Sequence, residues 1–102
     1  MTHRTPLIEV RSAALLTGQP THLKVFEDGV ELLTEARDPF RKNYQRARAR
    51  YEHIAQVIVR GGSFFSDLII ETPGGGTLTA VGLPTRAARE ARELIEQLLR
   101  GW

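Results

Sequence analysis

The chain of 102 residues contains no cysteine, which excludes disulfide bonds and thiolate metal sites. It also lacks a long uninterrupted apolar run. Residues 1–20 hold only short apolar stretches broken by Glu9 and Arg11, and this pattern predicts neither a signal peptide nor a membrane-spanning helix. We therefore expect a cytoplasmic protein, with the inner face of the membrane as an alternative location. The length predicts one domain over residues 1–102, with residues 1–6 frayed.

Patterns typical of catalytic or metal sites are missing as well. No serine lies in a G-x-S-x-G turn, and the glycine run 74–76 lacks the following lysine of a phosphate-binding loop. His53 stands beside Glu52, but nothing in the sequence converges on it, so we expect a surface histidine. The histidines lack the spacing of a metal pair: His3, His22 and His53. We predict no enzymatic activity, no catalytic residue, no cofactor and no metal.

Alternating apolar and polar residues predict strands over much of the chain. Residues 7–16, 22–27, 30–35, 64–71 and 77–82 have this pattern or are rich in β-branched residues. Turn residues separate them, most clearly Asp28-Gly29 and the stretch Pro73 to Gly76. The first three strands are expected to form a meander, and residues 36–43 a loop.

Residues 44–60 fit two interpretations. Tyr44, Ala47, Tyr51, Ile54 and Ile58 lie on one stripe of a helix, and Asp38-Pro39 would begin that helix well. Alternation of arginine with alanine over residues 46–50 fits a strand instead. The β-branched run from Val57 to Val59 favours strands over about 45–51 and 54–60.

The C-terminal residues predict an amphipathic helix over about 84–100. Pro84 or Thr85 is expected at its start, the threonine as a side-chain cap, and Gly101 at its end. Apolar residues recur at three- and four-residue steps and form one stripe: Ala87, Ala88, Ala91, Leu94, Ile95, Leu98, Leu99 and Trp102. The fold class is therefore mainly β, a seven-stranded bent sheet or barrel capped by a C-terminal helix.

Several segments resemble the bacterial pleckstrin-homology-like (PH-like) domain family. They are Val25–Leu32, Tyr51–Val57, Gly61–Thr72, Gly74–Gly76 and Gly82–Pro84, and the likeness covers roughly residues 20–100. The resemblance implies a seven-stranded, strongly bent sheet closed by a C-terminal helix. Its motifs are turn glycines and core aliphatic residues, so it implies a fold and names no ligand.

A basic segment is the main candidate for binding. Residues 37–50 contain six basic residues and one acid, whereas the rest of the chain is net acidic. Clustered cations can hold phosphate, which arginine contacts through two N–H groups. The candidate site residues are Arg41, Lys42, Arg46, Arg48 and Arg50.

Part of this segment loosely matches a family pattern. Lys42, Arg46 and Arg48 resemble the basic motif with which eukaryotic pleckstrin-homology domains hold inositol phosphates. The family's motif lies between its first two strands, where this chain offers only Lys24. The competing interpretation is an exposed strand face whose arginines pair with acids of the neighbouring hairpin: Glu27, Asp28, Glu31 and Glu35.

The expected function is that of a non-catalytic binding or assembly module. Protein–protein interaction or self-association, through a free strand edge or the helix, is preferred over binding of anionic lipid or phosphate by residues 41–50. Nucleic acid is disfavoured because only Tyr44 and Tyr51 accompany the arginines, and Tyr51 is expected in the core. Phe64 and Phe65 could anchor a partner or enter a bilayer, but we expect the bent sheet to cover both.

Overall fold

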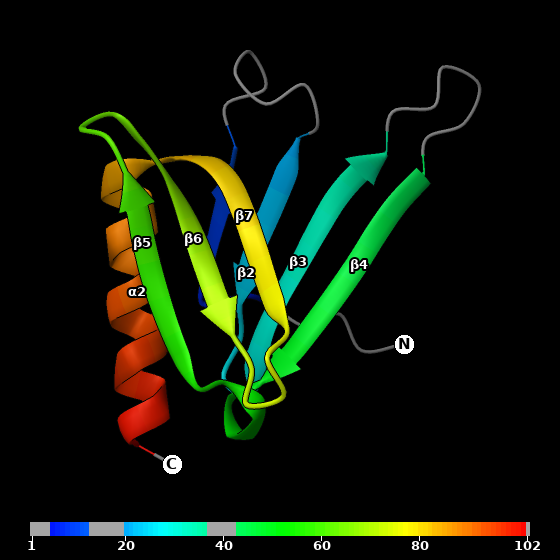
Figure 1. Cartoon of the computed structure of the whole chain (residues 1–102), viewed down its shortest axis with the longest axis vertical. Coiled ribbons are helices and arrows are strands. Elements are labelled where there is room, and N and C mark those ends of the chain that lie inside the picture. Colours follow the sequence, from blue (N-terminus) through cyan, green and yellow to red (C-terminus); the bar gives the residue numbers. More distant parts are fainter. Residues whose placement is uncertain (1–4, 13–19, 37–42, 102) are drawn as a thin grey trace.

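The computed structural model describes residues 5–12, 20–36 and 43–101. Four strands form one antiparallel sheet in the order β1-β2-β3-β4: Ile8–Arg11, Thr21–Val25, Gly29–Ala36 and Asn43–Arg50. Three strands form a second antiparallel sheet in the order β5-β6-β7: Gln56–Gly61, Phe65–Glu71 and Thr77–Pro84. A short 3-10 turn, η1 (Tyr51–His53), joins the two sheets, and the helix α2 (Thr85–Arg100) follows the last strand (Figure 1).

The first sheet follows the alternation of its sequence. Leu23 and Val25 of β2 are fully buried, while the intervening His22 and Lys24 lie on the outer face. The turn between β2 and β3 contains the predicted Asp28-Gly29 pair. Gly29 is required there because a Cβ atom at this position would lie 2.5 Å from the carbonyl oxygen of Ala49.

Residues 44–60 form two strands, as the β-branched run indicates, and the helical interpretation is wrong. β4 ends at Arg50, η1 turns the chain, and β5 begins at Gln56. Tyr51 sits in this corner with its ring buried, as expected, and its hydroxyl donates a hydrogen bond to the carbonyl of Phe26. A residue buried at the corner gives the chain a fixed change of direction from the first sheet to the second.

The helix α2 packs against the inner face of the second sheet and against β1. Ala88, Ala91 and Ile95 of its apolar stripe are fully buried, which confirms the predicted helix and its face. The helix begins at Thr85 after Pro84 and ends before Gly101, as predicted, but the expected side-chain cap of Thr85 is wrong. No side chain caps the helix, and the hydroxyl of Thr85 instead donates to the carbonyl of Gly62, 3.0 Å away, so it ties α2 to the β5–β6 turn.

The two sheets enclose one core but do not form a closed hydrogen-bonded barrel. Each is a separate sheet in the described part of the chain, and they meet through packing of β2 against β7 and through α2. The expected seven strands are present, whereas the barrel is replaced by two sheets that open toward the side where α2 lies (Figure 1). Within the described ranges, no helix is both long and apolar enough to cross a bilayer.

Candidate functional site

The arginines of β4 occupy the outer face of the first sheet. Arg46, Arg48 and Arg50 alternate with Ala47 and Ala49, and their side chains are exposed. The other two candidate residues, Arg41 and Lys42, lie outside the described residues. The structure therefore places three of the five predicted residues on one face of one strand.

The carboxylate of Glu31, on the neighbouring strand β3, forms ion pairs with two of these arginines. The Glu31 side chain is only 9% exposed, and its two oxygens lie 3.3 Å from Arg46 Nε and 2.9 Å from Arg48 Nε. Arg50 is paired at 3.2 Å with Glu52, which is itself exposed. The predicted ion pairing with the adjacent hairpin is thus confirmed for Glu31. Two carboxylates neutralise much of the positive charge of this face.

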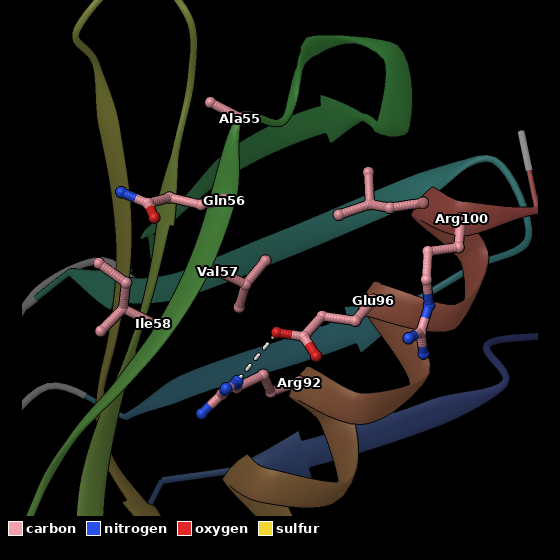
Figure 2. Close-up of a pocket in the computed structure, with 8 residues that line it drawn as sticks. Ala55, Gln56, Val57, Ile58, Arg92, Glu96 and Arg100 are labelled. Atoms are coloured by element: carbon pink, nitrogen blue, oxygen red, sulfur yellow. Dashed lines mark hydrogen bonds and ion pairs between the residues drawn. The ribbon is translucent and has the colours of Figure 1, made fainter.

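A groove lies between β5 and α2. It has a volume of about 530 Å³, and its walls are formed by residues 55–58 on the strand side and by Arg92, Glu96, Leu99 and Arg100 on the helix side. In Figure 2, the Val57 side chain points toward the helix, whereas the side chains of Gln56 and Ile58 point away from it. Arg92 and Glu96 form an ion pair at 3.1 Å on the helix wall.

A second hollow lies next to the groove, beside η1. It has a volume of about 440 Å³ and shares Ala55 and Leu99 with the groove. Tyr51 lines it, and burial, followed by the charge of Asp28, raises the pKa of the Tyr51 phenol to about 12. The phenol is therefore neutral at physiological pH and remains a hydrogen-bond donor to the Phe26 carbonyl.

Within the described residues, β5 has a backbone edge that no strand covers. β5 and β7 are the outer strands of the second sheet, and β1 and β4 those of the first. β1 and β5 both contact α2, and β7 contacts β2, but β5 also lines the groove that separates it from part of α2. An edge strand leaves alternate N–H and C=O groups without a ladder partner, so β5 offers backbone hydrogen bonds next to a partly apolar wall.

The expectation that the sheet covers both phenylalanines is wrong. Phe64 is 81% exposed and Phe65 is 42% exposed. Phe64 precedes β6 and does not share the inner face of Leu68 and Ile70, which are buried. The predicted alternation holds from Phe65, the first residue of β6, onward, because Phe64 lies in the bend that precedes the strand.

The polar residues considered for catalysis have structural partners or lie apart. Ser66 and Thr85 form a buried hydroxyl pair at 2.7 Å, and Asp67 accepts a hydrogen bond from the Gly82 amide at 3.0 Å. His53 is exposed in η1, as expected. Among the described residues, no cluster of three or more histidine or acidic side chains could hold a metal ion.

Comparison with known proteins gives a likeness of fold only. No protein-family model matches the chain, and no curated protein matches it. The solved structure of the pleckstrin homology (PH) domain of USP37 is similar, with a TM-score of 0.60 and 15% sequence identity, over 92% of this chain and 98% of that chain. This likeness supports the PH-like fold that the sequence implies.

Proposed function

We propose that this domain is a non-catalytic protein-binding module that takes an extended segment of a partner along the free edge of β5. The observation that carries the proposal is the position of this edge beside the groove of residues 55–58 and α2. An added strand would gain backbone hydrogen bonds from β5 and would set every second side chain into the groove.

The walls of the groove suit a peptide. Val57, Ala55 and Leu99 supply apolar surface, and the ion pair of Arg92 with Glu96 lies on the helix wall. Arg100 lines the same groove and is exposed. A segment with alternating apolar residues and one acid near Arg100 would match these features. Side-chain pockets of this kind select among peptide sequences, while the backbone hydrogen bonds give affinity that depends little on the peptide sequence.

The free edge of β4 is a poorer site for pairing with a second copy. Antiparallel pairing of two β4 strands about Arg48 would set Arg46 of one copy opposite Arg50 of the other. Like charges directly opposite each other destabilise a strand pair. The alternative function, binding of anionic lipid or phosphate through residues 41–50, ranks second because Glu31 and Glu52 already pair with the arginines.

The proposal can be tested with a displayed library of random peptides selected against the domain. We expect binders whose addition shifts the backbone amide signals of residues 55–58 and of the C-terminal half of α2. Leu99→Gln should weaken these peptides about tenfold, because it removes apolar contact from the groove. Val81→Gln is the matched control, since Val81 is exposed and does not line the groove.

Light scattering on the domain alone identifies whether a second copy fills the edge. A dimer that Leu99→Gln dissociates and Val81→Gln preserves would make self-association the function of this site. The proposal would be contradicted if the selected peptides shifted amide signals of residues on the outer faces of the sheets instead. A strict monomer that selects no peptide would contradict it as well.

A further inference from the structure

Two adjacent phenylalanines are exposed at the β5–β6 turn. In the described part of the chain the exposed large apolar residues are Leu7, Phe64, Phe65 and Val81. Phe64 and Phe65 lie where the β5–β6 turn, the end of β7 and the start of α2 come together, and Val81 lies farther along β7. Phe65 is paired with Pro84 in the strand register, and Val81 precedes Gly82, whose amide is bonded to Asp67 of β6.

The backbone holds the two phenylalanines in a fixed turn. Gly61 has φ +145°, and the Gly62 amide donates to the Phe65 carbonyl at 3.0 Å, which closes the hairpin. The Thr85 amide donates to the Phe64 carbonyl at 2.9 Å, so the turn is also fastened to the first residue of α2. Figure 1 shows the β5–β6 turn projecting at the edge of the molecule beside the start of α2. Phe64 is therefore held outward by a rigid frame.

Cations surround this apolar tip. Arg60 immediately precedes Gly61, and it is exposed. Arg86 follows Thr85, whose amide donates to the Phe64 carbonyl. The Arg86 side chain is 94% exposed, and its Nε lies 3.8 Å from a carboxylate oxygen of Glu90. No acidic residue occurs between positions 60 and 66 or in the first turn of α2. Asp67 lies opposite Arg60 in the strand register, where it accepts a hydrogen bond from the Gly82 amide, and it offsets part of the positive charge. The tip thus combines protruding aromatic rings with two exposed arginine side chains.

We propose that this tip, formed by Arg60, Phe64, Phe65 and Arg86, binds the surface of an anionic lipid bilayer. Phe64 enters the region between the headgroups and the acyl chains, Phe65 lies at its edge, and the two arginines lie at the level of the lipid phosphates. Burial of an aromatic ring and attraction of arginine to anionic headgroups are the two terms that bring a peripheral protein to a membrane.

The shape and charge of the tip favour a bilayer over a protein pocket. The most exposed ring is on a convex hairpin turn, and a soft surface can accept a convex tip without a preformed cavity. The flanking arginines are attracted to an anionic bilayer however the domain is rotated about the membrane normal, because this attraction needs no specific partner residue. This site is separate from the proposed β5 groove, whose walls do not include Phe64 or Phe65.

Vesicle flotation tests the proposal. The full chain is mixed with vesicles of equimolar phosphatidylcholine and phosphatidylglycerol, and with vesicles of phosphatidylcholine alone. We expect binding to the anionic vesicles that falls as salt is raised. Phe64→Ser should reduce this binding about tenfold, because it removes an inserted aromatic ring. Arg60→Gln with Arg86→Gln should reduce binding to the anionic vesicles only.

Two control variants locate the contact. Leu7→Ser removes another exposed apolar residue whose amide is bonded to Val25, away from the tip, and it should leave binding unchanged. Arg50→Gln removes a cation of β4 and should also leave it unchanged. Loss of binding in Arg50→Gln with full binding in Phe64→Ser would assign the membrane contact to β4 and overturn the proposal.

A spectroscopic measurement tests insertion directly. Phe64→Trp in a Trp102→Phe background places the only tryptophan at the tip. Its emission should shift to the blue on addition of the anionic vesicles, and brominated lipid should quench it. Absence of both binding and shift would overturn the proposal. So would a blue shift that appears without lipid as the protein concentration rises, because it would assign Phe64 to a protein contact.

Discussion

Replacing Arg46 and Arg48 with glutamine distinguishes a structural role of these cations from a binding role. Both contact the nearly buried carboxylate of Glu31, at 3.3 Å and 2.9 Å. A hydrogen bond to a charged group contributes about 1.5–3 kcal/mol, while an exposed ion pair contributes about 0–1 kcal/mol. Because the arginine side chains are more than half exposed, we expect a loss of about 1 kcal/mol for either single substitution.

The double substitution should cost more than the sum of the two. After one substitution the other arginine still neutralises Glu31, but after both the carboxylate keeps neither of these cations. Removing the partners of a buried charge costs about 3 kcal/mol or more. Adding Glu31→Gln to the double variant should recover most of this loss, since an amide has no charge to compensate.

The measurement is urea unfolding followed by circular dichroism, supported by the midpoint temperature. For a domain of this size a loss of 1 kcal/mol lowers that temperature by about 4–8 °C. Arg50→Gln is the matched control, because Arg50 and its partner Glu52 are both exposed, and it should change stability by less than about 0.5 kcal/mol. Additive losses below 1 kcal/mol in total, with no recovery by Glu31→Gln, would refute the reasoning.

Three further predictions concern the fold. Gly29→Ala should destabilise the domain by about 1–3 kcal/mol through its clash with the neighbouring backbone, whereas Gly74→Ala, which meets open space, should be neutral in the same melting assay. Tyr51→Phe should cost about 1 kcal/mol. Because the folded-state pKa of Tyr51 is raised from 10.0 to about 12, wild-type stability should be complete below pH 10 and fall as pH rises toward 12. In urea titrations, the Tyr51→Phe variant should lack the loss of stability that ionisation of Tyr51 causes between pH 10 and pH 12. Ile95→Ala should cost about 2–5 kcal/mol and the exposed Glu93→Ala less than about 0.5 kcal/mol.

Local patterns predicted the elements of the fold because each element buries one side. In β2 the alternation of Leu23 and Val25 with polar residues identifies both the strand and its inner face. In α2 the spacing of Ala88, Ala91 and Ile95 does the same. The turn at Asp28-Gly29 was predictable because an Asp-Gly pair between two β-like runs is a hairpin signal. In the structure, a Cβ atom at Gly29 would clash with the Ala49 carbonyl.

The arrangement of the elements was less accessible from the sequence. Whether seven strands close into a barrel depends on hydrogen bonding between residues far apart in the chain, and no local pattern encodes it. The same holds for the edge position of β5 and therefore for the groove beside α2. The exposure of Phe64 was missed because the predicted strand began at Phe64, whereas this residue lies in the bend before β6 begins at Phe65.

The charged face of β4 shows how the structure changes the meaning of a sequence feature. Counted along the chain, residues 37–50 are strongly basic, and this suggested an anion site. In the sheet, Arg48 lies directly opposite Glu31, so part of that charge stabilises the pairing of β3 with β4. The same arginines disfavour pairing of β4 with another copy of itself. The edge of β5 has no such row of like charges, since it carries Gln56, Val57 and Ile58 beside the groove. The edges of β4 and β5 therefore differ in the charge that they present to a partner strand, which is why we assign partner binding to β5.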